Sequence, residues 1–146
     1  MAVLKATTCK EAISRWEKAK GQVAADALVV ELQFMYPPIE KMDGALSTLE
    51  TVSDTLEELW VSYNNIDKMK GIGTLKNLRV LYMCNNSVKE WVEFNRLQEC
   101  PALRDLVFIG NPICDNQPDI ETWRTQVANR LTQIIKLDGI PIIREG

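Results

Sequence analysis

Residues 78–88 read Leu-Arg-Val-Leu-Tyr-Met-Cys-Asn-Asn-Ser-Val, and the same pattern occurs twice more in this chain of 146 residues. Apolar residues occupy positions 1, 4, 6 and 11 of the pattern, and asparagine occupies position 9. The copies begin at Leu56, Leu78 and Leu103, so their offsets are 22 and 25 residues. Five positions that recur in phase three times indicate a tandem structural repeat.

A period of this length with the pattern L-x-x-L-x-L-x-x-N-x-L is typical of leucine-rich repeats, in which each copy forms one coil of a solenoid. The L-x-L core is a short strand whose alternate side chains point to opposite sides. Successive strands joined by return segments are parallel, and such crossovers are right-handed. We therefore expect an α/β leucine-rich-repeat solenoid, right-handed, with a short parallel sheet on its concave face and helical caps at both ends.

Position 9 of each copy is asparagine, at the point where the chain leaves the strand. An asparagine amide both donates and accepts hydrogen bonds, so it can pair backbone groups that stacking would otherwise bury without partners. We expect the three side chains to form a structural ladder through the stack. Its members are Asn64, Asn86 and Asn111.

The repeats occupy residues 56–113 of a single domain that spans 1–146, and a solenoid needs caps at both ends. Residues 1–55 are predicted to form an N-terminal helical cap and a lead-in segment, because Thr8 and Glu11 match a capping box and Gly21 could end the helix. Residues 114–146 are predicted to form the C-terminal cap. They contain an apolar stripe with helical spacing: Ile120, Trp123, Val127 and Leu131.

The strand positions beside the inward-facing residues should face outward from the concave side of the sheet. These positions form three rows across the strands, and the side chains of the central row are large and apolar although the core does not require it. Exposed apolar patches with charged rims mark protein interfaces. Tryptophan and tyrosine are also enriched at binding hot spots. The three predicted rows are Glu58, Val80 and Asp105; Trp60, Tyr82 and Val107; and Ser62, Cys84 and Ile109.

The composition argues against catalysis and against several classes of partner. Histidine is absent, so the commonest general base and a frequent metal ligand are missing. No phosphate-binding loop or metal-site spacing occurs, and we expect no enzyme activity and no cofactor. A net charge of −3 offers no basic field for nucleic acid. Without a signal peptide or a long apolar run, the sequence predicts a cytoplasmic protein with reduced cysteines and no membrane contact.

Six stretches of the chain carry a more specific signal. They are residues 37–43, PPIEKMD; 46–49, LSTL; 54–60, DTLEELW; 77–83, NLRVLYM; 110–112, GNP; and 136–139, KLDG. The Pro-Pro-Ile-Glu-Lys-Met run is specific within leucine-rich-repeat proteins, whereas Gly-Asn-Pro is common to many. Together the stretches resemble the light chain 1 family of outer-arm axonemal dyneins, and the resemblance runs over nearly the whole chain.

This resemblance implies a light chain that binds the motor region of an axonemal dynein heavy chain, near its microtubule-binding stalk, and tunes motility in the axoneme of a cilium or flagellum. The chain departs from the family in two ways. Leu49 and Leu56 are only seven residues apart, where the family carries about two more repeats. The family also has a longer tail after Asp138-Gly139.

Other partners stay open at this point. The same fold serves phosphatase-regulatory subunits and ribonucleoprotein scaffold subunits, and the fold alone does not choose between them. Direct contact with tubulin is a further alternative, because tubulin is acidic and the chain has small basic clusters. They are Lys68 with Lys70, Lys76 with Arg79, and Arg124 with Arg130.

Overall fold

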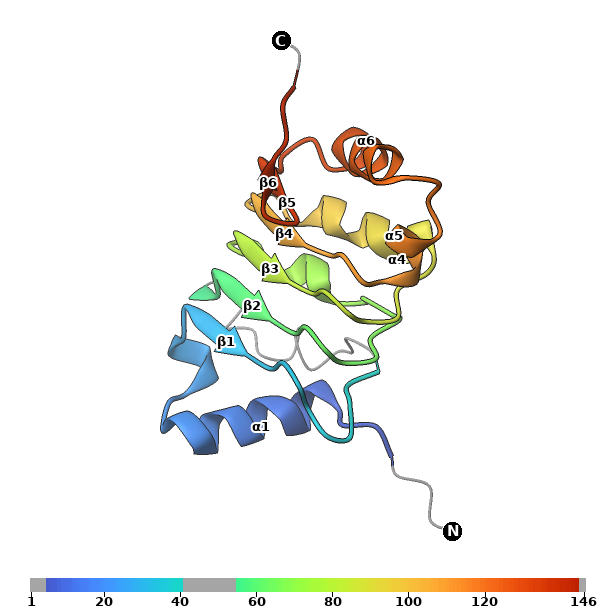
Figure 1. Ribbon diagram of the computed structural model, residues 1–146. Coiled ribbons are helices and arrows are strands. Elements are labelled where there is room, and N and C mark those ends of the chain that lie inside the picture. The colour runs from blue at the N-terminus through green and yellow to red at the C-terminus, as the bar shows by residue number, and fades with distance from the viewer. Residues whose placement is uncertain (1–4, 41–54, 145–146) are drawn as a thin grey trace.

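The computed structural model describes residues 5–40 and 55–144 and shows a stack of coils between two capping helices (Figure 1). The stretches 41–43 and 46–49, which contribute to the family resemblance, lie outside these ranges. The helices are α1 (Cys9–Lys20), α4 (Trp91–Phe94), α5 (Pro112–Asp115) and α6 (Ile120–Arg130). The strands are β1 (Val29–Glu31), β2 (Glu58–Trp60), β3 (Val80–Tyr82), β4 (Asp105–Val107), β5 (Lys136–Leu137) and β6 (Ile140–Pro141). Short 3-10 turns cover Ala24–Asp26, Ile72–Thr74 and Asn95–Glu99.

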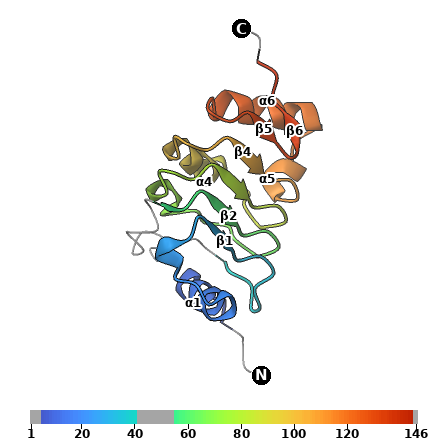
Figure 2. The same cartoon turned by 90° about the vertical axis from the view of Figure 1, so that its left-hand side faces the viewer.

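The sheet is wider than the three repeats alone predict. Its order is β1-β2-β3-β4-β5-β6, and the first five strands run parallel. β1 comes from the lead-in segment and β5 from the C-terminal cap, so each predicted cap also contributes a strand. Among the described strands, β6 alone runs in the opposite direction and pairs antiparallel with β5. Figure 2 shows the coils stacked between α1 at one end and α6 at the other.

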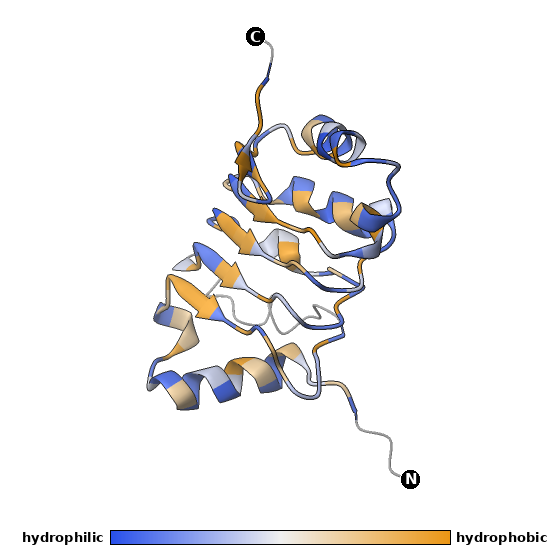
Figure 3. Cartoon of the chain, viewed as in Figure 1, coloured by the Kyte–Doolittle hydropathy of each residue, from blue (hydrophilic) through white to orange (hydrophobic). Residues whose placement is uncertain are grey.

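The inward-facing repeat positions form the core. Leu59, Leu81 and Leu106 lie opposite one another in neighbouring strands and are 0–1% exposed. Each three-residue strand buries its middle residue and leaves the other two half-exposed. In Figure 3 the strands are mostly hydrophobic in colour, whereas α1 and α6 carry both colours, as expected when one helix face packs on the core.

The asparagine side chains pair the backbone of adjacent coils. The amide nitrogen of Asn86 donates to the Met83 carbonyl of its own coil at 3.3 Å and to the Val61 carbonyl of the preceding coil at 3.0 Å. Its amide oxygen accepts the Ile66 N–H at 3.0 Å. Asn64 makes the equivalent bonds one coil below, where it donates to the Val61 and Leu32 carbonyls and accepts the Ile39 N–H. Asn111 makes them one coil above, where it donates to the Phe108 and Met83 carbonyls and accepts the Val88 N–H.

An aspartate takes over where the asparagine series ends. One carboxylate oxygen of Asp138 accepts the Phe108 N–H at 2.6 Å and the Ile109 N–H at 3.0 Å. The other accepts the indole N–H of Trp123 at 2.9 Å. Asp138 therefore joins the last full coil, the capping helix α6 and the turn between β5 and β6.

Both capping helices begin at a side-chain cap. The Thr8 hydroxyl accepts the Glu11 N–H at 3.1 Å, and Gly21 ends α1 in the left-handed conformation at φ 64°. Asp119 accepts the Thr122 N–H at 2.7 Å, so α6 begins at Ile120.

The prediction of an apolar stripe in the C-terminal cap is wrong for its first residue, Ile120. Ile120 is the first residue of α6, and 51% of its surface is exposed, whereas Trp123, Val127 and Leu131 are fully buried.

A buried carboxylate links the coils on the helical side. Glu93 in α4 is only 6% exposed, accepts the Met69 N–H at 2.8 Å and pairs with Arg96 at 3.1 Å. Burial by itself raises the pKa of Glu93, but the Met69 hydrogen bond and the Arg96 charge outweigh it, and the pKa lies below its ordinary value. Nothing in the repeat pattern predicted this contact.

We expect Asn86→Ala to lower the free energy of unfolding by about 1–3 kcal/mol, because the Ile66 N–H loses its partner inside the stack and the Val61 and Met83 carbonyls each lose one of two amide donors. Urea denaturation followed by circular dichroism measures the change. Asn65→Ala is the matched control, since Asn65 is exposed although it neighbours a ladder residue. Equal effects of the two substitutions would contradict the ladder role.

Glu93 should make stability depend on acid pH. Because its folded pKa is lowered, its contribution is complete above the unfolded value of about 4.3 and is lost as the pH falls through the folded value. The expected result is that Glu93→Gln destabilises at pH 7 and that the difference from the wild type shrinks below pH 4. Thermal melting at several pH values checks this, and a difference independent of pH would refute it.

Candidate protein-binding face

The strand register aligns the predicted surface residues into rows across the sheet. Glu58, Val80 and Asp105 are direct neighbours, and so are Trp60, Tyr82 and Val107. The added strands extend both rows, with Val29 and Lys136 in the first and Glu31 in the second. We call this solvent-facing side of the sheet, with its three rows, the sheet face.

The centre of the sheet face is an aromatic pair. The rings of Trp60 and Tyr82 lie 5.3 Å apart between centroids, at an interplanar angle of 47°. Both side chains are half-buried although they point away from the core. The Trp60 indole N–H donates to the Glu58 carboxylate at 3.3 Å, which orients the ring from the neighbouring row. Such a pair offers rigid apolar area together with polar edges.

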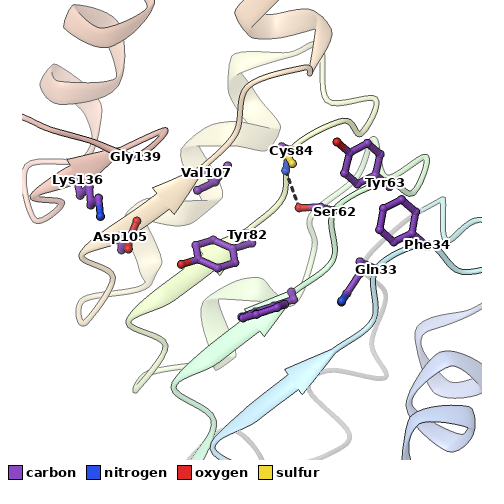
Figure 4. A pocket seen from close by; sticks show the side chains of 11 residues that line it. Gln33, Phe34, Ser62, Tyr63, Tyr82, Cys84, Asp105, Val107, Lys136 and Gly139 are labelled. Atoms are coloured by element: carbon purple, nitrogen blue, oxygen red, sulfur yellow. Dashed lines mark hydrogen bonds between the residues drawn. The ribbon is translucent and has the colours of Figure 1, made fainter. Parts of the chain in front are cut away.

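A shallow pocket of about 280 Å³ lies over this pair (Figure 4). Asp105, Lys136 and Gly139 border one end of the pocket, and Gln33, Phe34 and Tyr63 border the other, with Tyr82 between them. Trp60, Ser62, Cys84 and Val107 complete its lining. Six of the nine predicted surface residues are therefore brought together in one hollow.

The predicted positions differ in how far they are exposed. Ser62 lies on the predicted side and lines the pocket, but it is only 8% exposed, because its hydroxyl turns along the sheet and accepts the Cys84 N–H at 3.1 Å. Ile109 is 46% exposed but does not line the pocket. Glu58 and Val80 flank the pocket from the first row and are half-buried.

An aromatic pair at the edge of the pocket is not predicted by the repeat pattern. The Phe34 and Tyr63 rings stack at 4.5 Å with an angle of 10°, and their side chains are 67% and 48% exposed. Both residues have positive φ, as have Asn85 and Gly110 at the same place in later coils. The signal was available for Tyr63, which directly precedes Asn64, but Phe34 belongs to a coil without a matching asparagine.

Carboxylates dominate the electrostatics of this region. Burial, followed by the charges of Asp105 and Glu58, raises the pKa of Tyr82 above its ordinary value. Burial also raises the pKa of Asp105, with Glu58 adding to the shift and Lys136 opposing it. The aromatic pair therefore sits in a negative potential.

Two of the three basic clusters considered for tubulin are engaged within the chain, whereas Lys68 and Lys70 are exposed. Arg124 donates to the carbonyls of Leu137, Ile140 and Pro141, and the Arg130 guanidinium lies 3.9 Å above the Trp91 ring. Lys76 donates to the Glu99 carbonyl, and Arg79 pairs with Glu57 at 3.6 Å. These side chains have structural partners on the rim of the stack.

The described residues show no cluster of three or more histidine, cysteine or acidic side chains that could hold a metal ion. Within the same ranges, no helix is both long enough and apolar enough to cross a bilayer.

Comparison with known proteins points in one direction. The chain is 41% identical to Dynein axonemal light chain 1 of Rattus norvegicus, over 97% of this chain and 96% of the relative. It is 42% identical to the protein of that name from Ciona intestinalis and 38% identical to that from Chlamydomonas reinhardtii, covering more than nine tenths of each. No family model matches the chain.

Solved structures support the fold. The Drosophila melanogaster SNF/U2A' complex contains a chain that superposes with a TM-score of 0.68 at 20% identity, covering 82% of this chain and 64% of that one. The Mex67 LRR domain of Chaetomium thermophilum superposes with a TM-score of 0.64 at 16% identity, covering 92% of both chains. At these identities the likeness establishes a leucine-rich-repeat architecture.

The length of the alignment agrees with a shorter stack. The alignment with the rat protein runs over 186 positions, whereas this chain has 146 residues, so at least 40 positions of the relative have no counterpart here (186 − 146). This difference in length is close to two repeats of 22 residues, the number that the short spacing between Leu49 and Leu56 predicts to be missing.

We expect one thiol to react rapidly with Ellman's reagent in the native protein. Cys84 is half-exposed on the sheet face, whereas Cys9, Cys100 and Cys114 are buried. Burial also raises the pKa of Cys100 to about 12, and it is the main cause of the raised pKa of Cys114, about 11. The reactive thiolate form of both residues is therefore disfavoured. Cys84→Ser should abolish the fast phase, and guanidinium should release all the remaining thiols. Two or more fast native thiols would contradict this geometry.

Proposed function

This chain belongs to the axonemal dynein light chain 1 family, and we propose on that basis that it is a non-catalytic light chain whose sheet face binds a dynein heavy chain. The proposed contact is with the motor region near the microtubule-binding stalk, where the light chain would modulate motility in the axoneme of a cilium or flagellum. The observation that carries the proposal is the half-exposed Trp60–Tyr82 pair on a face of the sheet that no described segment covers.

The sheet face has the composition of a binding surface. A few aromatic side chains at the centre of an interface commonly supply most of its affinity, while the surrounding residues exclude water. Here Trp60 and Tyr82 form the centre, and Glu58, Val80 and Asp105 form a partly charged border. The stacked rings of Phe34 and Tyr63 extend the aromatic surface toward the N-terminal coil.

The added strands enlarge this surface. Five parallel strands at roughly 4.8 Å spacing give a face about 19 Å wide, rather than the 10–15 Å of three strands. A face of this width accommodates a helix or an extended segment across its rows. Its side chains are held by the core beneath, so little ordering is needed on binding.

Other kinds of partner are distinguished by a capture experiment. A phosphatase-regulatory or ribonucleoprotein scaffold role would use the same fold, and the structural neighbours below 25% identity establish only that fold. Affinity capture from flagellated cells with the tagged full chain separates the cases. Recovery of an axonemal heavy chain supports the proposal, and recovery of a phosphatase catalytic subunit or an RNA-bound complex without heavy chain contradicts it.

We expect Trp60→Ala to weaken heavy-chain binding by at least about 2 kcal/mol, roughly 30-fold in Kd, because it removes the aromatic centre of the interface. Isothermal titration with a purified stalk fragment of the heavy chain measures this. Ile120→Ala is the control, since it shortens an exposed apolar side chain on α6. Unchanged affinity of a folded Trp60→Ala protein would remove the sheet face as the contact.

A further inference from the structure

Two of the acidic groups around the aromatic pair, Glu58 and Asp105, form no ion pair within the described residues. Of the described carboxylates on the sheet face, Glu31 is paired with Lys20 at 3.4 Å. Neither Glu58 nor Asp105 belongs to an ion pair within the described ranges; Glu58 accepts only the Trp60 indole N–H. Among the described residues, Lys136 is the one cationic side chain that lines the pocket, and it lies next to Asp105 in the first row. Glu58 and Asp105 therefore border the aromatic rings with a single cation nearby, which leaves a net negative charge.

The two carboxylates stand on either side of one strand. Glu58 lies in β2 and Asp105 in β4, in the same row, with Val80 of β3 between them. At roughly 4.8 Å per strand their backbones are about 10 Å apart. Figure 4 shows the Tyr82 hydroxyl on the side of the ring nearer Asp105. A cation placed over the rings would thus meet negative charge from two directions.

We propose that this pocket receives an arginine side chain of the partner protein, with its guanidinium against the Trp60 and Tyr82 rings and between Glu58 and Asp105. This inference rests on the proposed function, because it specifies the chemistry by which the sheet face recognises its partner. A planar guanidinium stacks on aromatic faces and carries five N–H donors, so it can serve both carboxylates while contacting the rings.

The geometry favours arginine over lysine. A lysine ammonium is a compact, strongly hydrated charge and cannot both stack on a ring and reach two carboxylates on opposite sides. The same chain already uses this stacking elsewhere, where the Arg130 guanidinium lies 3.9 Å above Trp91. At the far end of the pocket, the rings of Phe34 and Tyr63 provide an apolar wall for the residues that flank the incoming arginine.

The first experiment neutralises the acidic border. Glu58→Gln/Asp105→Asn should weaken binding of the heavy-chain stalk fragment at least tenfold and should flatten the dependence of Kd on salt concentration. The matched control is Glu57→Gln/Glu121→Gln, which removes the same charge from residues outside the three rows of the sheet face. Melting temperatures verify that both double variants are folded. If the two double variants bind alike, the arginine pocket is refuted and the proposed function stands.

The second experiment uses a small probe and does not depend on the heavy chain. N-acetyl-arginine methylamide should shift the Trp60 indole N–H signal in nuclear magnetic resonance spectra, with the signal assigned from a Trp60→Phe protein. The neutral analogue N-acetyl-citrulline methylamide should shift it at least fivefold less, and the lysine analogue should fall between them.

The outcomes separate the two proposals. If the protein prefers the arginine probe but does not bind the stalk fragment, the inference about the pocket's chemistry stands and the proposed partner is overturned. Equal shifts with the arginine and citrulline probes would overturn the arginine pocket, whatever the heavy chain does.

Discussion

Hydrogen bonds from side-chain amides to the backbone where each strand ends make the rest of this structure possible. Each three-residue strand stops while still inside the stack, so the carbonyls and N–H groups that follow it would be buried without partners. Asn64, Asn86 and Asn111 each donate to carbonyls of their own coil and of the preceding coil, and each accepts one backbone N–H at that point. Because each asparagine reaches the preceding coil, the same bonds also set the stacking distance and the strand register.

The surface chemistry follows from that register. Once coils stack in phase, residues 22 or 25 positions apart in the chain become neighbours, which places Trp60 beside Tyr82 and brings Glu58 and Asp105 into one row. A shift of one residue in any strand would turn these side chains into the core. The face proposed to bind the heavy chain therefore depends on the ladder beneath it.

The stack also explains how a shorter member of the family can keep its architecture. Coils contact mainly their immediate neighbours, so removal of whole coils leaves each remaining interface of the same kind. β1 pairs directly with β2, and Asn64 bonds both Leu32 and Ile39 of the first coil. The ladder thus continues into a coil whose own sequence lacks the asparagine.

The repeat, the inward-facing leucines, the asparagine ladder positions and the outward-facing strand positions were predictable from the sequence, because all of these follow from local periodicity. Other features became visible only in the folded chain: the extra strands β1 and β5, the buried hydroxyl of Ser62, the inter-coil contact of Glu93 and the stacking of Phe34 on Tyr63. These features depend on which residues of different coils come to lie side by side. That proximity has no period in the chain and arises only when the coils are packed together.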